Sequence, residues 1–258
     1  YPADIIESAL NAGAHVVTAN KAAVAKHYAR LHAAAERSGA VLAFSASVGG
    51  GAPVIEAVRR LKDRAGLATV EGVMNGTGNF ILSKLGEGWA FEDAVKTAQD
   101  MGFAEADPSA DVDGHDAADK LSILIREAFG ADVPPESIAK DSLSVCSPEK
   151  AQEALERGEV FKQVGRCVLN ADGSVEASVV VAPVKQGGAL SRTRNEENAF
   201  LVTDASGRVH AIHGKGAGRW PTAAAVFADV MDVQRTAAAV GLAKALAEED
   251  ARPVLKRA

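Results

Sequence analysis

The feature that most constrains the fold is an alternation of apolar, β-branched runs with helical segments over the first 90 residues. The apolar runs cover residues 15–20, 41–48 and 68–76, and the helical segments cover 3–12, 21–38, 54–63 and 79–86. This alternation is typical of βαβ units in a parallel or mixed sheet. We therefore expect an α/β fold.

The second half of the chain changes its period. Helical patterns over 91–102 and 113–130 each stop at a glycine, which is the usual helix stop signal. Residues 158–213 then alternate like strands, with turn sequences at 171–173 and 205–207. A long alanine-rich helix is predicted over 221–247.

Charge and cysteine content exclude several classes of protein. Asp and Glu outnumber Lys and Arg by 34 to 28, and no basic run offers a surface for nucleic acid or an anionic membrane. No stretch of 18 apolar residues or basic leader predicts a membrane span or export. Cys146 and Cys167 lack metal or redox spacing, which favours reduced thiols in a cytoplasmic protein. No zinc site is predicted from the six histidines.

Residues 102–121 concentrate six carboxylates just before an apolar helix. One interpretation is helix capping, with Asp113 as the N-cap, Asp116 as its capping-box partner and the helix dipole favouring negative charge. An EF-hand is excluded because Ser122 occupies the position of the bidentate glutamate. The six residues are Glu105, Asp107, Asp111, Asp113, Asp116 and Asp119.

Capping does not account for the positions of Asp116 and Lys120. If Ala117, Leu121, Leu124 and Ala128 form the buried stripe, the pair lies on its flank, while Ser122, Asp119 and Arg126 face away. Half-desolvated carboxylate and ammonium groups there can hold a zwitterionic small molecule. A surface salt bridge between residues four apart is the alternative, and this segment alone does not separate the two.

Four further segments surround the acidic one in a characteristic order: VVTANKA (16–22), SVGGGAP (47–53), NGTGNFIL (75–82) and GKGAGRWPTAAAV (214–226). Together these motifs resemble those of homoserine dehydrogenases, and the resemblance covers most of the chain. It implies NAD(P)-dependent interconversion of L-homoserine and L-aspartate 4-semialdehyde, in the branch of metabolism that leads to threonine, methionine and isoleucine. The expected partner is an amino-acid substrate.

The resemblance also implies roles for individual residues. Glu105 and Asp116 would bind the substrate ammonium, with Asp111 supporting them and Thr77 available for a further substrate contact. Lys120 would be the general acid/base. Lys21 would lie between nicotinamide and substrate and share proton transfer. A helix start lowers a lysine pKa and nearby carboxylates raise it, so the sequence leaves the balance at Lys21 open.

The glycine segments are expected to hold the cofactor and a cation. Gly216 and Gly218 would approach the nicotinamide end of NADP or NAD, although an ordinary loop-to-helix turn is the alternative. In the family, carbonyl oxygens matching those of Val48, Gly50 and Ala52 bind a monovalent cation, Na⁺ or K⁺. Ser45 stands where the family usually has a glutamate, so cation affinity should fall or vanish.

The expected fold is a remnant Rossmann-type nucleotide-binding domain, residues 1–48 and 214–258, joined to a mixed α/β substrate and dimerisation domain, residues 49–213. The family's GxGxxG turn is missing before Tyr1, which predicts a deleted or cleaved first half of the nucleotide domain. Homodimerisation through the sheet is expected. Two alternatives are another Rossmann-type dehydrogenase and a catalytically silent dimerisation or metabolite-binding module.

Overall fold

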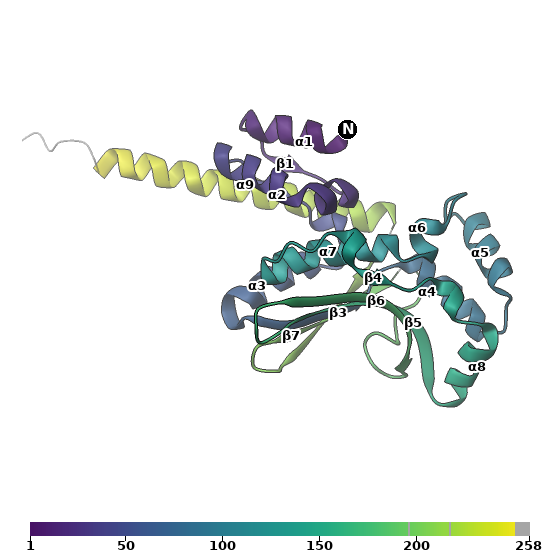
Figure 1. Cartoon of the computed structure of the whole chain (residues 1–258). Coiled ribbons are helices and arrows are strands. Elements are labelled where there is room, and N and C mark those ends of the chain that lie inside the picture. Colours follow the sequence, from purple (N-terminus) through teal and green to yellow (C-terminus); the bar gives the residue numbers. More distant parts are fainter. Residues whose placement is uncertain (196, 217, 251–258) are drawn as a thin grey trace, which may run out of the picture.

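Two β-sheets form the framework of the protein. The computed structural model describes residues 1–195, 197–216 and 218–250, and Figure 1 shows their arrangement. In the larger sheet the strand order is β4-β6-β5-β3-β7-β8, and every neighbouring pair is antiparallel except β4 with β6. In the smaller sheet, β1 (Val16–Val17) pairs in parallel with β2 (Leu42–Ala43). The six strands of the larger sheet are β3 (Leu67–Val73), β4 (Ala139–Lys140), β5 (Glu159–Leu169), β6 (Val175–Lys185), β7 (Glu197–Asp204) and β8 (Val209–Lys215).

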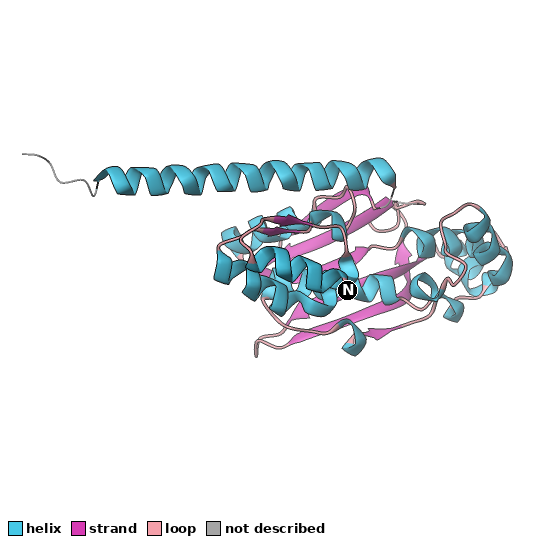
Figure 2. Ribbon diagram, turned by 90° about the horizontal axis from the view of Figure 1, so that it is seen from above, coloured by secondary structure: helices cyan, strands magenta, loops and turns pink. Residues whose placement is uncertain are grey.

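Helices cover one face of the larger sheet. Figures 1 and 2 show α3, α4 and α7 on that face, with α1 and α2 stacked above them and α9 extending beyond the rest of the molecule. The arrangement confirms the predicted mixed α/β fold. Short 3-10 turns lie at Ser45–Ser47, Pro135–Ser137 and Leu143–Val145. The helices are α1 (Pro2–Asn11), α2 (Lys21–Ser38), α3 (Val54–Ala65), α4 (Gly76–Gly86), α5 (Phe91–Asp100), α6 (Ser109–Val112), α7 (His115–Phe129), α8 (Pro148–Glu156) and α9 (Arg219–Asp250).

Both predicted hairpin turns are confirmed. Gly173 lies between β5 and β6 with a φ of 84°, a backbone conformation that favours glycine. Between β7 and β8 the carboxylate of Asp204 accepts hydrogen bonds from the backbone N–H groups of Ser206 (2.9 Å) and Arg208 (3.1 Å). Local hydrogen bonds of this kind explain why turn sequences are readable without tertiary information.

The first two predicted strands are much shorter than expected. Asn20 ends the first one, because its side chain accepts a hydrogen bond from the N–H of Ala23 and caps α2. In the second, the Ser47 hydroxyl donates to the Phe44 carbonyl, and the N–H of Ser45 donates to Asp229 of α9. These backbone groups therefore bond outside a sheet ladder.

Helix α7 is the centre of the core. It packs against α2, α3 and the larger sheet, and one continuous apolar cluster runs from α1 through α7 to the sheet. The prediction that Ser122 and Arg126 face away from the core is wrong. The Ser122 hydroxyl donates to the Val133 carbonyl, and the Arg126 guanidinium donates to the Ala25 carbonyl and Asp132. A helix packed on several sides leaves little of its surface to solvent.

Candidate active site

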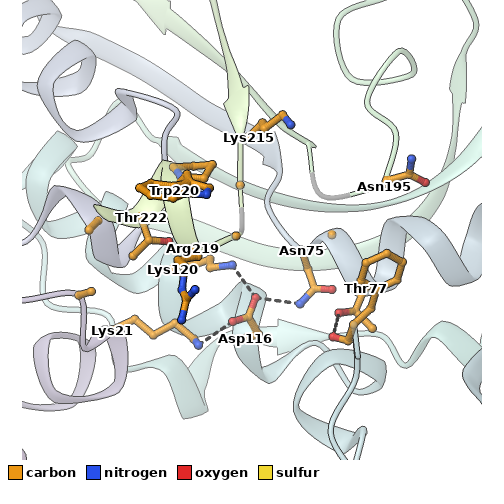
Figure 3. A pocket seen from close by; sticks show the side chains of 18 of the residues that line it. Lys21, Asn75, Thr77, Asp116, Lys120, Asn195, Lys215, Arg219, Trp220 and Thr222 are labelled. Atoms are coloured by element: carbon orange, nitrogen blue, oxygen red, sulfur yellow. Dashed lines mark hydrogen bonds and ion pairs between the residues drawn. The ribbon is translucent and has the colours of Figure 1, made fainter. Parts of the chain in front are cut away.

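A cavity of about 1190 Å³ lies where α2, α4 and α7 begin, beside the loop that leads into α9 (Figure 3). Among the predicted site residues, the cavity is lined by Lys21, Gly50, Thr77, Asp111, Asp116, Lys120, Gly216 and Gly218. Residues that are far apart in the sequence thus meet in one place.

Asp116 is the charged centre of this cavity. It lies in the first turn of α7, where the helix dipole favours a carboxylate, and only 8% of it is exposed. The predicted N-cap at Asp113 is wrong. Gly114 occupies the cap with a left-handed φ of 75°, and Asp113 instead ends α6. The left-handed turn separates α7 from the four-residue α6, which the sequence pattern had not predicted.

Two ammonium groups flank the Asp116 carboxylate on opposite oxygens. Lys21 Nζ is 2.8 Å from Oδ1, and Lys120 Nζ is 2.7 Å from Oδ2. Lys120 also donates to the Met74 carbonyl at 2.7 Å, so its position is fixed from two sides. Figure 3 shows both lysines pointing at the carboxylate. The structure brings together the two residues predicted to carry protons.

Asn75 is a site residue that the sequence analysis missed. It lies between β3 and α4, and its Oδ1 accepts from the N–H of Gly78, which caps α4. Its Nδ2 donates to Asp111 at 2.6 Å and to Asp116 at 2.8 Å. An asparagine before Gly-Thr-Gly at a strand end is a recognisable cap, but the sequence did not show which carboxylates it meets.

The pKa values follow from this arrangement. Burial raises the pKa of Asp116, but Lys120 and Lys21 outweigh burial and hold that pKa well below its usual range. Burial lowers the pKa of Lys21, but attraction by Asp116 outweighs it, so the pKa of Lys21 is raised. The balance that the sequence left open at Lys21 is therefore decided by the carboxylate. Burial raises the pKa of Asp111.

The remaining predicted substrate residues are placed differently. The Thr77 hydroxyl lies at the cavity but donates to the Phe103 carbonyl at 2.7 Å. Glu105 is exposed and does not line the cavity; its backbone carbonyl accepts from Gln99 at 3.2 Å. The structure thus brings Thr77 and Asp111 to the cavity and leaves Glu105 outside it. The role of Glu105 stays a prediction.

The two glycine loops pack against each other and form one wall of the cavity. The N–H of Gly51 donates to the Lys215 carbonyl at 2.8 Å. A Cβ on Gly50 would lie 2.5 Å from the Gly216 carbonyl oxygen, so only glycine permits this approach. Gly218 has a φ of 113°, which also favours glycine. Arg219 and Asn195, which the sequence analysis did not single out, line the same cavity.

The predicted cation loop, residues 48–52, offers a cation only neutral backbone oxygens as ligands. Val48 and Ala52 are buried, and the Ala52 carbonyl already accepts from the N–H of Val54 at 2.8 Å. Ser45 is buried as well and adds no charge. Within the described residues, no group of three or more His, Cys, Asp or Glu side chains could hold a metal ion. Cation binding stays a prediction.

Two further observations concern the cysteines and membrane spans. Cys146 and Cys167 are free and buried. No helix in the described part of the chain is long and apolar enough to cross a membrane.

Comparisons with known proteins cover both parts of the chain. The family profile described as "Homoserine dehydrogenase, NAD binding domain" matches residues 1–45, and that described as "Homoserine dehydrogenase" matches residues 53–231. A homoserine dehydrogenase of Corynebacterium glutamicum is 38% identical over 91% of this chain and 54% of its own length. An NAD(+)-dependent homoserine dehydrogenase of Pseudomonas canavaninivorans is 34% identical over 89% of this chain and 65% of its own length.

A solved structure of a homoserine dehydrogenase from Thiobacillus denitrificans superposes with a TM-score of 0.87 at 37% identity, covering 92% of this chain and 55% of that one. The fold and the matches define an α/β protein in which part of an NAD-binding domain adjoins a catalytic domain. The chain belongs to the homoserine dehydrogenase family. It spans 54% to 65% of the length of these three relatives.

Proposed function

We propose that this chain carries the catalytic site for the NAD(P)-dependent interconversion of L-homoserine and L-aspartate 4-semialdehyde. The observation that carries the proposal is the pair of ammonium groups held on opposite oxygens of the buried Asp116, at the edge of the large cavity. Membership of the homoserine dehydrogenase family supports the same reaction. The greater length of the relatives means that the activity of the whole enzyme is proposed rather than established for this chain.

The glycine loops form the wall of the cavity that we assign to the cofactor. The backbone of Gly216 and Gly218 lines the cavity, and the close contact of Gly216 with Gly50 leaves no room for side chains between the loops. We propose that these residues and Lys21 hold the nicotinamide end. NAD(P)H, when bound, supplies the hydride for the aldehyde carbon.

The proton for the aldehyde oxygen comes from a lysine ammonium. Lys120 Nζ has three N–H groups, of which two donate to Met74 and Asp116, so one remains for the substrate oxygen. Lys21 donates to Asp116 and lines the same cavity. In reduction the ammonium gives up one proton and becomes neutral, and in oxidation the neutral amine takes the proton from the hydroxyl. Asp116 orients both groups and remains ionised.

Asp111 is better placed to bind the substrate ammonium than Glu105 and Asp116, the two residues that the family resemblance implies. Both oxygens of Asp116 are already occupied, by Lys21 on one side and by Lys120 and Asn75 on the other. Within the described part of the chain, Asp111 accepts a side-chain hydrogen bond only at Oδ1, from Asn75. We therefore propose that the second oxygen of Asp111 holds the substrate ammonium, with Asp116 contributing long-range attraction.

Four further predictions belong to this proposal: the domain boundaries, the homodimer, the cytoplasmic location and the weak binding of a cation. Residues 1–48 with 214–258 would form the nucleotide domain and 49–213 the substrate domain. The profile matches support the first boundary, because one ends at residue 45 and the other begins at residue 53, whereas the second profile continues to residue 231. The protein would form a homodimer through the larger sheet and act in the cytoplasm. Any monovalent cation at the 48–52 loop would bind weakly.

The test is oxidation of NADPH or NADH with L-aspartate 4-semialdehyde, measured on this chain and on a longer form with the additional length of its relatives. Activity in either form that disappears in Lys120→Ala supports the proposal. Absence of activity in both forms favours a silent metabolite-binding module and contradicts it.

A further inference from the structure

A second cavity, of about 630 Å³, lies at the same end of the larger sheet as the first, where β5 begins and β6 ends. It opens between α4, α8, the start of β5 and the loop from Gln186 to Arg194. Figure 1 shows α4 and α8 next to each other there. None of its lining residues lines the first cavity, so the two are separate sites.

Lys162 places a buried positive charge at this cavity. Only 4% of the residue is exposed, and its Nζ donates to the Asn79 side-chain oxygen and to the Thr193 carbonyl. Both acceptors are neutral, and Lys162 forms no ion pair within the described part of the chain. A buried ammonium that is not ion-paired is unfavourable, and within the described residues one of the three N–H groups of Lys162 has no acceptor.

Two arginines add further positive charge at the same cavity. Arg192 and Arg194 line it, both are exposed, and neither forms an ion pair among the described residues. Among the described residues that line the cavity, Glu87 is the one carboxylate, and it is paired with Lys84 at 2.7 Å. Three cationic side chains therefore line the cavity, and the one described carboxylate in its wall is already paired.

Four large apolar side chains also line the cavity, beside the polar Ser83, Gln186, Ser191 and Thr193, and they narrow the class of ligand. Leu82, Leu155, Val160 and Phe161 line the cavity around the charged end. We propose that this cavity binds a small organic carboxylate, with its acidic group on Lys162 and the two arginines and its apolar part against these four side chains. Such a ligand supplies the missing counter-charge and buries apolar surface at the same time.

The second cavity is connected to the first through Asn79. Asn79 belongs to α4 and is 1% exposed; its oxygen accepts from Lys162 and its Nδ2 donates to the Asn195 carbonyl at 3.3 Å. Asn195 lines the first cavity and has a φ of 49°, in the left-handed region that is uncommon for a non-glycine residue. A carboxylate that draws Lys162 away from Asn79 thus acts on a residue of the candidate active site.

The test is calorimetric titration of this chain with hexanoate at pH 7, a probe with a carboxylate and a short apolar tail. We expect saturable binding that weakens at least tenfold in Lys162→Met. The matched control is Lys96→Met, a change in an exposed lysine of α5, which should bind as the unmodified chain does. Because Lys162 is buried, the double change Arg192→Gln, Arg194→Gln at exposed positions gives a second measurement, and we expect it to weaken binding severalfold.

Binding should also weaken as the pH rises through about 8. Burial, followed by repulsion from Arg194, lowers the pKa of Lys162 to about 8, and Glu197 opposes this shift. Arg192 and the paired Glu87 are the other charged groups at the cavity.

Several outcomes would overturn the inference. These are undetectable hexanoate binding, equal binding by 1-hexanol, tighter binding of inorganic phosphate, or unchanged binding in Lys162→Met. Loss of hexanoate binding in Asp116→Asn would place the ligand in the first cavity instead. None of these readouts requires enzymatic activity, so failure here is distinguishable from failure of the proposed function.

Discussion

Two groups of lysines in this protein have opposite surroundings. Lys21 and Lys120 share the Asp116 carboxylate, whereas the described hydrogen-bond acceptors of Lys162 are the neutral oxygens of Asn79 and Thr193. Burial disfavours the ammonium form in both places, yet the pKa of Lys21 is raised while burial and Arg194 lower that of Lys162 to about 8. The partner's charge, rather than burial, therefore decides whether a lysine stays protonated.

The largest expected effect is on catalysis, because only the first group is proposed to transfer a proton. In an active, longer form of the protein, Lys120→Ala should lower turnover by about 10²- to 10⁴-fold, the usual contribution of a general acid or base. Steady-state kinetics measures this, with circular dichroism to show an intact fold and Lys96→Ala as a control. Normal turnover would show that Lys120 is not the proton carrier.

The next effect tests the shared carboxylate. Asp116→Asn leaves two ammonium groups without their counter-charge, so we expect the free energy of unfolding at pH 7 to fall by about 3 kcal/mol. Asp100→Asn, which removes an exposed ion pair with Lys96, should cost less than about 1 kcal/mol. Urea denaturation compares the two.

The same variant has a defined pH dependence. The pKa of Asp116 is depressed in the folded state, so its contribution is complete above the usual carboxyl pKa and is lost as the pH falls below it. The difference between the unmodified chain and Asp116→Asn should shrink in acid. A difference that is small at pH 7 would contradict the view that the carboxylate stabilises both lysines.

Lys162 should show the opposite pH dependence from Lys21. Because the folded pKa of Lys162 is about 8, the unfolded chain binds more protons between pH 8 and 10.5, and stability should rise across that window. Relative to Lys162→Met, we expect a gain of roughly 3 kcal/mol. Lys21, whose pKa is raised, stabilises the fold below pH 10.5 and loses this contribution above it.

Urea denaturation of Lys162→Met and Lys21→Met at several pH values measures both slopes. Slopes of the same sign would mean that the two environments do not differ as described.

The smallest expected effect concerns the 48–52 loop. Ser45 offers a neutral hydroxyl where the family resemblance leads us to expect a glutamate, so potassium titration of an active form should give a weak response or none. A strong, saturable activation would show that backbone carbonyls suffice, and Ser45→Glu would then be expected to strengthen it.

Much of the fold was readable because its signals are local. Gly173, and Asp204 with its turn, set the two hairpins through hydrogen bonds and backbone angles within a few residues. Asn20 caps α2 through the next turn of chain. By contrast, the burial of Ser122 and Arg126 was mispredicted because one helix pattern does not show how many neighbours the helix has.

The site was readable in part for the same reason. Motif order pointed to Lys21, Lys120, Asp116 and Thr77, which do lie at one cavity. It did not place Glu105 outside that cavity, and it did not find Asn75, whose second function is to bridge two carboxylates. The contacts of Asn75 with the two carboxylates depend on how β3, α4 and α7 are arranged in space. A local sequence pattern does not predict this arrangement.

The sequence by itself determined the kinds of element, the positions of the turns and the set of charged groups that the protein can use. Only the tertiary structure decided which charge each group meets: Asp116 for Lys21, and neutral oxygens for Lys162. The physical reason is that caps and turns act within a few residues, whereas ion pairing and desolvation depend on distance and burial in space.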